Sequence, residues 1–397
     1  MSALRGIADL GDLEKLPVIV RADLNVPIDE DGAIIDDARI LAAAATVRAL
    51  SDGGAYVIVL AHRGRPGGRR VPGATLLPIA ERLSRTLGVL VAHAPDVIGP
   101  LAHAAILNLR PGDVVLLENV RFEAGEVEDD DVLAARLAVP GRAFVFDAFG
   151  AAHRSEASTV GVARHLPSHA GLLVQHEVAA LEDLRASGAL DGAVVVVGGV
   201  KAADKLPALA RLAERAQAIV VGGAVAHALL AATGDARLGA SIVDRDAVQA
   251  ARDVVEAASR TGCELVLPTD VIATDGLTTD ARIRVEAARS VPDGAIALDI
   301  GPETRAVFGE RIAAASTVIW DGPPGAFEME PFAEGTRAVA TAIAKASGTT
   351  VVGGGDTGSA LRGLGLAREV DYLSTGGGSM LHLLAGLPLA AIEGLRS

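Results

Sequence analysis

Two glycine-rich segments near the C-terminus have the composition of phosphate-binding turns. Residues 349–365 (TTVVGGGDTGSALRGLG) and 372–386 (YLSTGGGSMLHLLAG) each run from a β-branched stretch through consecutive glycines into an apolar helical pattern. Glycine lets the backbone approach a ligand closely, and the first amides of a helix have no intrahelical partner and attract anions. One such segment alone is more often a plain tight turn. Two together, with Asp356 directly after Gly355, predict a nucleotide with its metal.

The first half of the chain carries polar and cationic side chains near the ends of successive apolar runs. These are Arg21, Asn25, Arg39, His62, Arg63, Arg65, Arg121, His153 and Arg154. Any one of these arginines alone is best interpreted as a solvated surface residue. Their repetition at five expected strand ends, in a chain whose net charge is −14, predicts a small anionic ligand. The planar guanidinium fork binds carboxylate and phosphate bidentately.

In the second half of the chain, the expected strand ends are mostly neutral and are followed by glycines. VVVVGGVKAADK at 194–205 places Gly198, Gly199, Lys201 and Lys205 at a strand end and helix start, and Gly222 and Gly223 follow the next apolar run. This segment is neither a Walker A loop nor a GxGxxG fingerprint, which sets aside an NAD-dependent dehydrogenase. The segment 320–332 (WDGPPGAFEMEPF) is either a tight proline-rich loop or one whose Glu328 reaches a ribose hydroxyl.

Short apolar runs alternate with helical patterns along the whole chain, which predicts parallel strands joined by crossover helices. The rhythm restarts after residue 190, so two α/β sheets in series are expected. Residues 166–188 between them are interpreted as a helix-like connection without a strand. Ligands of open parallel sheets bind beyond the carboxyl ends of the strands, and this is where the candidate residues lie.

Composition is consistent with a two-domain soluble enzyme. The chain has 397 residues, half of them hydrophobic but only 3% aromatic, so its cores must consist of Ala, Val, Leu and Ile. The acidic balance argues against a general nucleic-acid or membrane-surface binder. A single cysteine, Cys263, excludes an internal disulfide framework and any multi-thiolate metal site. Neither a signal peptide nor an apolar run of eighteen residues is present, and we interpret the protein as cytoplasmic.

Ten ordered segments resemble the phosphoglycerate kinase family over essentially the whole chain. They are VRADLNVP (20–27), DDARI (36–40), HRGRP (62–66), LLENVRF (116–122), DAFGAAHR (147–154), GGVKAADK (198–205), DIGPET (299–304), FAEGT (332–336), GGGDT (353–357) and STGGG (374–378). The resemblance implies two Rossmann-like, three-layer α/β domains with parallel sheets joined by a hinge helix. The N-terminal domain would bind 3-phosphoglycerate, and the C-terminal domain would bind ATP or ADP with Mg²⁺. The expected divisions are 1–170, an interdomain helix at 171–189, 190–379, and a tail at 380–397 that returns to the N-terminal domain. A monomer is expected.

The same resemblance assigns the site residues. Those implied for 3-phosphoglycerate are Asp23, Asn25, Arg39, His62, Arg65, Arg121 and Arg154. Those implied for the nucleotide are Gly199, Lys201, Lys205, Gly222, Gly223, Asp321, Pro323, Glu328, Gly355, Asp356 and Thr357, with Asp356 as the metal ligand.

The reaction implied is phosphoryl transfer from ATP to a carboxylate, giving ADP and 1,3-bisphosphoglycerate. A carboxylate is already ionised at neutral pH, so no general base is needed, and positioning and charge neutralisation must supply the catalysis. We expect Arg39 to hold the reacting carboxylate. Lys201 and the amides of Gly376–Gly378, with Gly377 and Gly378 foremost, are expected to stabilise the transferring phosphoryl group.

Several residues depart from the usual family pattern, among them LPLA near the C-terminus in place of the usual LPGV. Phe146 and Asp321 stand where the family usually has Asn, Arg63 replaces Leu in HLGRP, and Val200 replaces Ala in the GGAK segment. A carboxylate at 321 is unfavourable beside nucleotide phosphates unless a metal or a lysine offsets it. Arg63 is expected to point outward, which would make the change neutral; pointing inward, it would favour a more anionic or differently shaped acid. Val200 is expected to narrow the purine pocket. These departures keep two alternatives open: a paralogous carboxylate kinase for a related phospho- or phosphono-acid, and a noncatalytic nucleotide-binding homologue.

Overall fold

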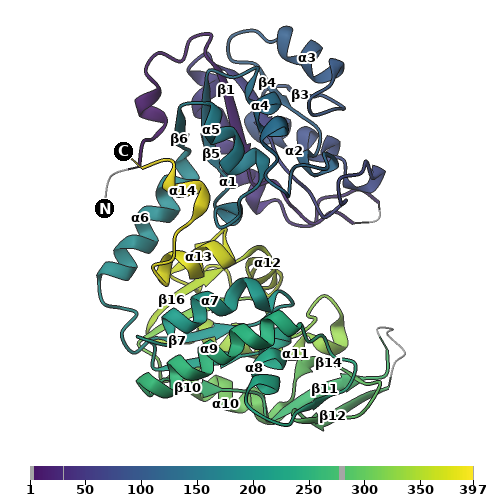
Figure 1. Ribbon diagram of the computed structural model, residues 1–397, viewed down its shortest axis with the longest axis vertical. Coiled ribbons are helices and arrows are strands. Elements are labelled where there is room, and N and C mark those ends of the chain that lie inside the picture. Colours follow the sequence, from purple (N-terminus) through teal and green to yellow (C-terminus); the bar gives the residue numbers. More distant parts are fainter. Residues whose placement is uncertain (1–3, 30, 277–281, 397) are drawn as a thin grey trace. The chain divides into compact units, whose positions relative to one another are not determined.

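Apolar β-branched runs form the strands of two parallel sheets in the computed structural model, and helices connect successive strands (Figure 1). The structure describes residues 4–29, 31–276 and 282–396. By their contacts these residues divide into two compact units. One comprises residues up to Ala180 together with those from Pro388 onward, and the other comprises Leu181–Leu387. Each unit has its own parallel sheet, so the predicted α/β class is confirmed.

Within the described residues, the sheet of the first unit has six parallel strands in the order β3-β4-β2-β1-β5-β6. The strands are β1 (Pro17–Ala22), β2 (Tyr56–Leu60), β3 (Val91–His93), β4 (Val114–Leu116), β5 (Ala143–Asp147) and β6 (Ser168–Ala170). The helices are α1 (Ala38–Asp52), α2 (Leu77–Leu87), α3 (Pro100–Leu107), α4 (Asp131–Ala138), α5 (Val162–His165) and α14 (Ala390–Glu393). Single turns are η1 (Ile7–Leu10), η2 (Pro72–Ala74), η3 (Val120–Phe122), η4 (Phe149–Ala151) and the π turn η5 (Ala157–Gly161). Helix α6 (Leu172–Ala186) begins in this unit and ends in the other.

The second unit repeats this plan, with a sheet of six parallel strands among the described residues in the order β10-β8-β7-β15-β16-β17. These strands are β7 (Val194–Val197), β8 (Ala218–Val221), β10 (Glu264–Val266), β15 (Thr317–Asp321), β16 (Thr349–Gly353) and β17 (Tyr372–Ser374). The helices are α7 (Ala202–Leu212), α8 (Gly223–Ala232), α9 (Arg245–Thr261), α10 (Pro302–Ala313), α11 (Glu334–Ala344), α12 (Gly355–Gly363) and α13 (Gly377–Leu384), with a single turn at η6 (Glu330–Phe332).

An antiparallel sheet, which the sequence analysis did not anticipate, is also part of the second unit. Strands β11 (Asp270–Thr274), β12 (Ile283–Ala287) and β14 (Ile296–Ile300) form it, with β11 in the middle. The short strands β9 (Arg237–Leu238) and β13 (Ser290–Val291) pair beside it. Strand β12 alternates exposed and half-buried residues and contains two charged side chains, so it lacks the continuous apolar run by which the parallel strands were found.

Small aliphatic side chains fill both cores, as the composition predicted. In the first unit Val18, Val20 and Val59 are fully buried on one face of the sheet. In the second unit Trp320, the single tryptophan of the chain, is fully buried in β15. Its Nε1–H donates to the carbonyl of Gly322 at 2.9 Å, so the indole is buried without an unpaired donor.

The expectation that residues 166–188 contain no strand is wrong. Ser168–Ala170 form β6, which pairs in parallel with β5 at the edge of the first sheet. The strand is short and two of its three residues are polar, so its sequence has no apolar run to reveal it.

Described residues near the two ends of the chain pack against each other. Leu4 and Arg396 form an antiparallel bridge, and the amide of Arg5 donates to the carbonyl of Leu395 at 3.0 Å. The amide of Ala391 donates to the carbonyl of Ala152 at 3.1 Å. The return to the first unit begins at Pro388, later than residue 380, where the sequence analysis divided the chain.

Candidate active site

The carboxyl edge of the first sheet carries the residues predicted to bind the acid substrate. Asp23 and Asn25 follow β1, Arg39 lies in the first turn of α1, His62 and Arg65 follow β2, Arg121 lies in η3 after β4, and Arg154 follows η4 after β5. Parallel topology thus brings residues from distant chain segments to one edge. Arg121 and His62 are buried, whereas Arg65 is exposed.

Arg21 has a different role from the ligand-facing one that its sequence position suggested. It lies within β1 and is fully buried. Its Nε donates to Ser158 Oγ at 2.8 Å, its Nη1 to the carbonyl of Ala22 at 2.6 Å, and its Nη2 contacts His62 Nδ1 at 2.8 Å. The guanidinium is therefore committed to internal partners and supports the neighbouring histidine.

This contact fixes the protonation of His62. A guanidinium only donates hydrogen bonds, so Nδ1 of His62 must be the acceptor, which assigns the ring proton to Nε2. Burial, reinforced by the positive charges of Arg21, Arg121 and Arg154, holds the pKa of His62 well below its ordinary value. His62 is thus a neutral N–H donor, and the positive charge of the site comes from arginine.

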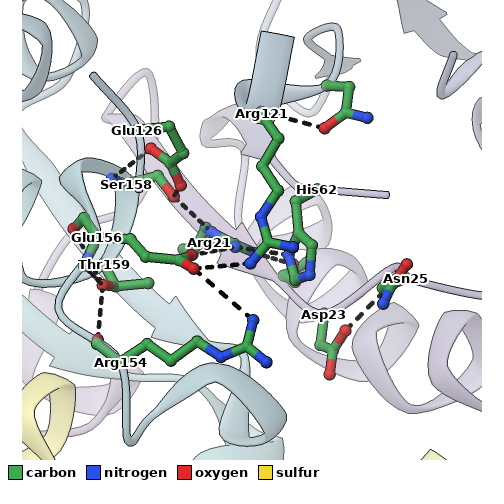
Figure 2. A network of polar contacts seen from close by, with 12 residues as sticks. Arg21, Asp23, Asn25, His62, Arg121, Glu126, Arg154, Glu156, Ser158 and Thr159 are labelled. Atoms are coloured by element: carbon green, nitrogen blue, oxygen red, sulfur yellow. Dashed lines mark hydrogen bonds and ion pairs between the residues drawn. The ribbon is translucent and has the colours of Figure 1, made fainter. Parts of the chain in front are cut away.

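A buried carboxylate that the sequence analysis did not single out faces the arginines (Figure 2). Glu156 Oε1 lies 2.7 Å from Arg121 Nη2 and 3.7 Å from Arg154 Nη1, and Oε2 lies 3.8 Å from Arg21 Nη2. Behind it, Ser158 Oγ donates to Glu126 at 2.5 Å. In the sequence, Glu156 could have been noticed because it is an acidic residue that follows His153 and Arg154 within three positions.

Arg39 is held by the loop that follows β1. Its Nη1 lies 3.2 Å from Asp23 Oδ1 and donates to the carbonyl of Asn25 at 3.0 Å. The side-chain oxygen of Asn25 accepts from the amide of Gly64 at 3.0 Å, which ties the loops after β1 and β2 together. Asp23 therefore positions Arg39 through this ion pair, and its negative charge offsets part of the positive charge of this edge.

In the second unit the predicted nucleotide residues gather at the carboxyl edge of the other parallel sheet. Gly199 and Lys201 follow β7, Gly222 and Gly223 follow β8, Asp321 ends β15 and precedes Pro323, Gly355, Asp356 and Thr357 open α12 after β16, and Gly377 and Gly378 open α13 after β17. Lys201 and Asp356 are exposed. Glu328 is also exposed, in the segment between β15 and η6.

Lys205 in the first turn of α7 and Asp321 at the end of β15 form a buried ion pair. Lys205 Nζ lies 2.9 Å from Asp321 Oδ2, and it directs hydrogen bonds to the carbonyls of Gly198 at 2.9 Å and of Asp321 at 3.1 Å. Their side chains are 11% and 4% exposed. A lysine therefore offsets the carboxylate at position 321, one of the two conditions that the sequence analysis set for it.

Close backbone contacts account for the glycines at these strand ends. Gly322 has a φ of +89°, and a Cβ there would lie 2.5 Å from the carbonyl oxygen of Gly198. A Cβ on Gly377 would overlap Asp321 Oδ1. The end of β15 thus packs directly against the turns after β7 and β17, which sets the shape of this edge.

The described residues contain no group of three or more His, Cys, Asp or Glu side chains arranged to hold a metal ion. The exposed carboxylate of Asp356 at the start of α12 is the donor that the sequence analysis proposed. One carboxylate suits Mg²⁺, which keeps most of its waters and is bound together with substrate phosphates.

None of the helices in the described ranges has the length and hydrophobicity that crossing a membrane requires.

Comparison with known proteins decides the family. A sequence model described as phosphoglycerate kinase matches residues 7–387. A phosphoglycerate kinase of Roseiflexus sp. (strain RS-1) is 44% identical over 383 residues, which cover 95% of each chain. The chain belongs to the phosphoglycerate kinase family. Members of this family are kinases that act on a carboxyl group, so the enzyme class predicted from the sequence is confirmed. The two alternatives, a paralogous kinase for a related acid and a noncatalytic homologue, are not favoured.

Solved structures agree with this assignment. The crystal structure of phosphoglycerate kinase from Pyrococcus horikoshii OT3 matches with a TM-score of 0.79 and 30% identity, covering 99% of this chain and 98% of that one. The phosphoglycerate kinase from Coxiella burnetii matches with a TM-score of 0.71 and 37% identity, covering 99% of both chains.

The other departures from the phosphoglycerate kinase pattern lie in three different environments. Arg63 is half-buried and donates to the carbonyl of Gly73 in η2. Phe146 is fully buried in β5, opposite Arg21 in the register of β1 and β5. Val200 is 69% exposed in the loop between β7 and α7. Arg63 is thus engaged with a neighbouring turn, and Phe146 adds apolar bulk beside the arginine that supports His62.

The second unit of this phosphoglycerate kinase family member should lose stability as pH rises. Asp299 in β14 accepts a hydrogen bond from the amide of Gly335, but burial raises its pKa to about 7. In the unfolded chain the carboxyl ionises near pH 4, so between these pH values the folded state holds the extra proton. Asp299 should therefore lower the free energy of unfolding between about pH 4 and about pH 7, and roughly 2 kcal/mol of that decrease should fall above pH 5. Burial lowers the pKa of His227 in the same unit, so His227 contributes in the opposite direction up to about pH 6.5.

Urea unfolding at pH 5 and pH 8, followed by the fluorescence of Trp320, measures this decrease. Asp299→Asn should remove the contribution of Asp299, because the amide has no proton to lose, and should leave that of His227. Asp293→Asn, an exposed position in the same unit, should leave both contributions in place. An equal pH dependence in the wild type and Asp299→Asn would contradict the assignment.

Proposed function

We propose that the chain catalyses reversible Mg²⁺-dependent phosphoryl transfer between ATP and the carboxylate of 3-phosphoglycerate, yielding ADP and 1,3-bisphosphoglycerate. One observation carries the proposal. The first unit has a sheet edge rich in buried and half-buried arginine. The second unit has a sheet edge formed by glycine turns, where Lys201 and Asp356 are exposed. The first suits a small phosphorylated acid, and the second suits a nucleotide. We further propose a cytoplasmic monomer.

In the acid site, Arg121 and Arg154 are proposed to bind the substrate phosphate, with Arg65, Asn25 and neutral His62 completing the hydrogen bonds. Arg39, steadied by its ion pair with Asp23, is proposed to orient the carboxylate that accepts the phosphoryl group. No residue is needed to remove a proton from that carboxylate, because it is already ionised. The protein acts by orientation and by neutralising charge.

In the nucleotide site, the turns at Gly199, Gly222 and Gly223 and the residues Pro323 and Glu328 are proposed to hold the nucleoside. The amides that open α12 and α13, at Gly355, Thr357, Gly377 and Gly378, are proposed to face its phosphates. Asp356 would hold Mg²⁺, which when bound neutralises charge on the nucleotide phosphates. Lys201, at the start of α7, is proposed to follow the phosphoryl group during transfer. Because the acyl phosphate product is labile in water, the reaction must exclude solvent.

A coupled assay with purified protein, ATP, Mg²⁺ and 3-phosphoglycerate tests the proposal. ADP release should reach about 1 to 1,000 per second, and hydroxylamine should trap the acyl phosphate as a hydroxamate. ADP release that does not depend on 3-phosphoglycerate would contradict the proposal. Negligible turnover with intact nucleotide binding would instead favour a related phospho- or phosphono-acid as the substrate.

A further inference from the structure

The acid site contains an acidic residue where an anionic substrate is expected to bind. Glu156 is 3% exposed, and the three guanidinium groups of Arg21, Arg121 and Arg154 lie within 3.8 Å of its carboxylate oxygens. Figure 2 shows this carboxylate directed toward them. Two of these arginines, Arg121 and Arg154, are proposed above to bind the substrate phosphate. Glu156 and the substrate would therefore share the same cations.

The local backbone fixes the direction of the Glu156 side chain. Its amide donates to Thr159 Oγ1 at 3.0 Å, and its carbonyl accepts from the amides of Thr159 at 3.0 Å and Gly161 at 3.2 Å. These bonds anchor Glu156 at the start of the π turn η5. Within the described residues Oε2 has no hydrogen-bond donor, so that oxygen is held by charge alone.

The two neighbouring acids have other direct partners. Asp23 pairs with Arg39. Glu126 accepts from the amide and hydroxyl of Ser158, and that hydroxyl accepts from Arg21. Burial raises the pKa of Glu126, and the charge of Arg21 opposes the rise. Among the described residues, Glu156 is therefore the carboxylate in direct ion-pair contact with all three of Arg21, Arg121 and Arg154.

We propose that Glu156 is a built-in counter-anion of the acid site, which stabilises the empty arginine cluster and holds down its affinity for anionic ligands. Unneutralised buried charges are costly, so without Glu156 the empty site would be less stable and would gain more from binding an anion. By weakening the hold on substrate and product alike, Glu156 favours release after each turnover. This inference rests on the proposed function of the same site, and it concerns the affinity of the site rather than the transfer step.

The test compares Glu156→Gln with the wild type by titration calorimetry, using inorganic sulfate and 3-phosphoglycerate as probes. Glutamine keeps an oxygen that accepts from Arg121 but removes the charge. Both anions should bind about tenfold more tightly to Glu156→Gln at low salt, and the gain should shrink with ionic strength. The melting temperature without anions should fall, and its rise on adding sulfate should exceed that of the wild type.

Asp129→Asn is the matched control. Asp129 pairs with Arg164 at 2.8 Å, outside the cluster, so the substitution changes the net charge equally. Its φ of +54° is one that asparagine tolerates. Sulfate affinity in this variant should equal that of the wild type.

Unchanged or weaker sulfate binding in Glu156→Gln would overturn the proposal. If that variant does not fold, Glu156→Asp replaces it, because it withdraws the carboxylate from Arg121 while keeping the charge. Its sulfate affinity should then be about two- to threefold tighter than in the wild type, and an equal or weaker affinity again overturns the proposal. Sulfate binding requires no kinase activity. A wild type that binds sulfate but not 3-phosphoglycerate would therefore reject the proposed substrate and leave the counter-anion intact.

Discussion

Replacing Lys201 with alanine should lower kcat for phosphoryl transfer by about a hundredfold or more while the protein stays folded. Lys201 is exposed in the loop after β7, directly before α7, so its removal leaves no cavity in the core. The reaction involves no covalent or acid–base step by the protein, and its rate therefore depends on groups that stabilise charge on the moving phosphoryl group. Loss of one such donor typically costs about 3 kcal/mol of transition-state stabilisation.

Steady-state kinetics in the coupled assay separate this role from simple binding. A fall in kcat with little change in KM for ATP indicates that Lys201 acts mainly in the transition state. Lys345→Ala is the control, since it removes the same charge from an exposed position in the same unit, and its kcat should match the wild type. A kcat for Lys201→Ala within about threefold of the wild type would remove Lys201 from the mechanism.

The fold was largely predictable from sequence because most of its parallel strands contain continuous apolar runs. Runs such as VVVV at 194–197 are buried over their whole length. Strand β6 was missed because two of its three residues, Ser168 and His169, are polar. The antiparallel strand β12 was missed because its exposed valine and isoleucine stand beside charged residues. Strand β11 was also missed, although it is buried over its whole length, and it lies between β12 and β14 in the antiparallel sheet. Pairing of that kind is not encoded in a single segment.

The position of a candidate residue at a sheet edge was predictable where its type coincides with a strand end or with the start of the following helix, as for Arg39, Arg121 and Asp356. It was not predictable where a residue acts through another. Arg21 looks like a ligand in the sequence, yet its alternation within β1 turns it toward Ser158 and His62. Glu156 has no motif of its own, and its importance follows from the three arginines that surround it. Such relations depend on register and on contacts between distant segments.

The ion pair between Lys205 and Asp321 leads to the largest expected loss of stability. Lys205→Met should lower the free energy of unfolding of the second unit by about 3 kcal/mol or more, because it leaves the carboxylate of Asp321 buried and unpaired. The substitution also removes the donor for the carbonyls of Gly198 and Asp321. Urea unfolding followed by Trp320 fluorescence measures the loss, and the exposed Lys345→Met serves as the control.

A double-mutant cycle separates the pair from the rest of the lysine's contacts. In Lys205→Met with Asp321→Asn no charge remains buried, so the double variant should recover most of the stability that Lys205→Met loses, to within about 1 kcal/mol of the wild type. Asp321→Asn alone leaves the ammonium with its two carbonyl partners and without its counter-charge. It should therefore lower the KM for ATP, because the positive charge becomes available to the nucleotide phosphates. Additive losses in the double variant would show that the two residues act independently. An unchanged KM in Asp321→Asn would show that the charge of Lys205 does not reach the nucleotide.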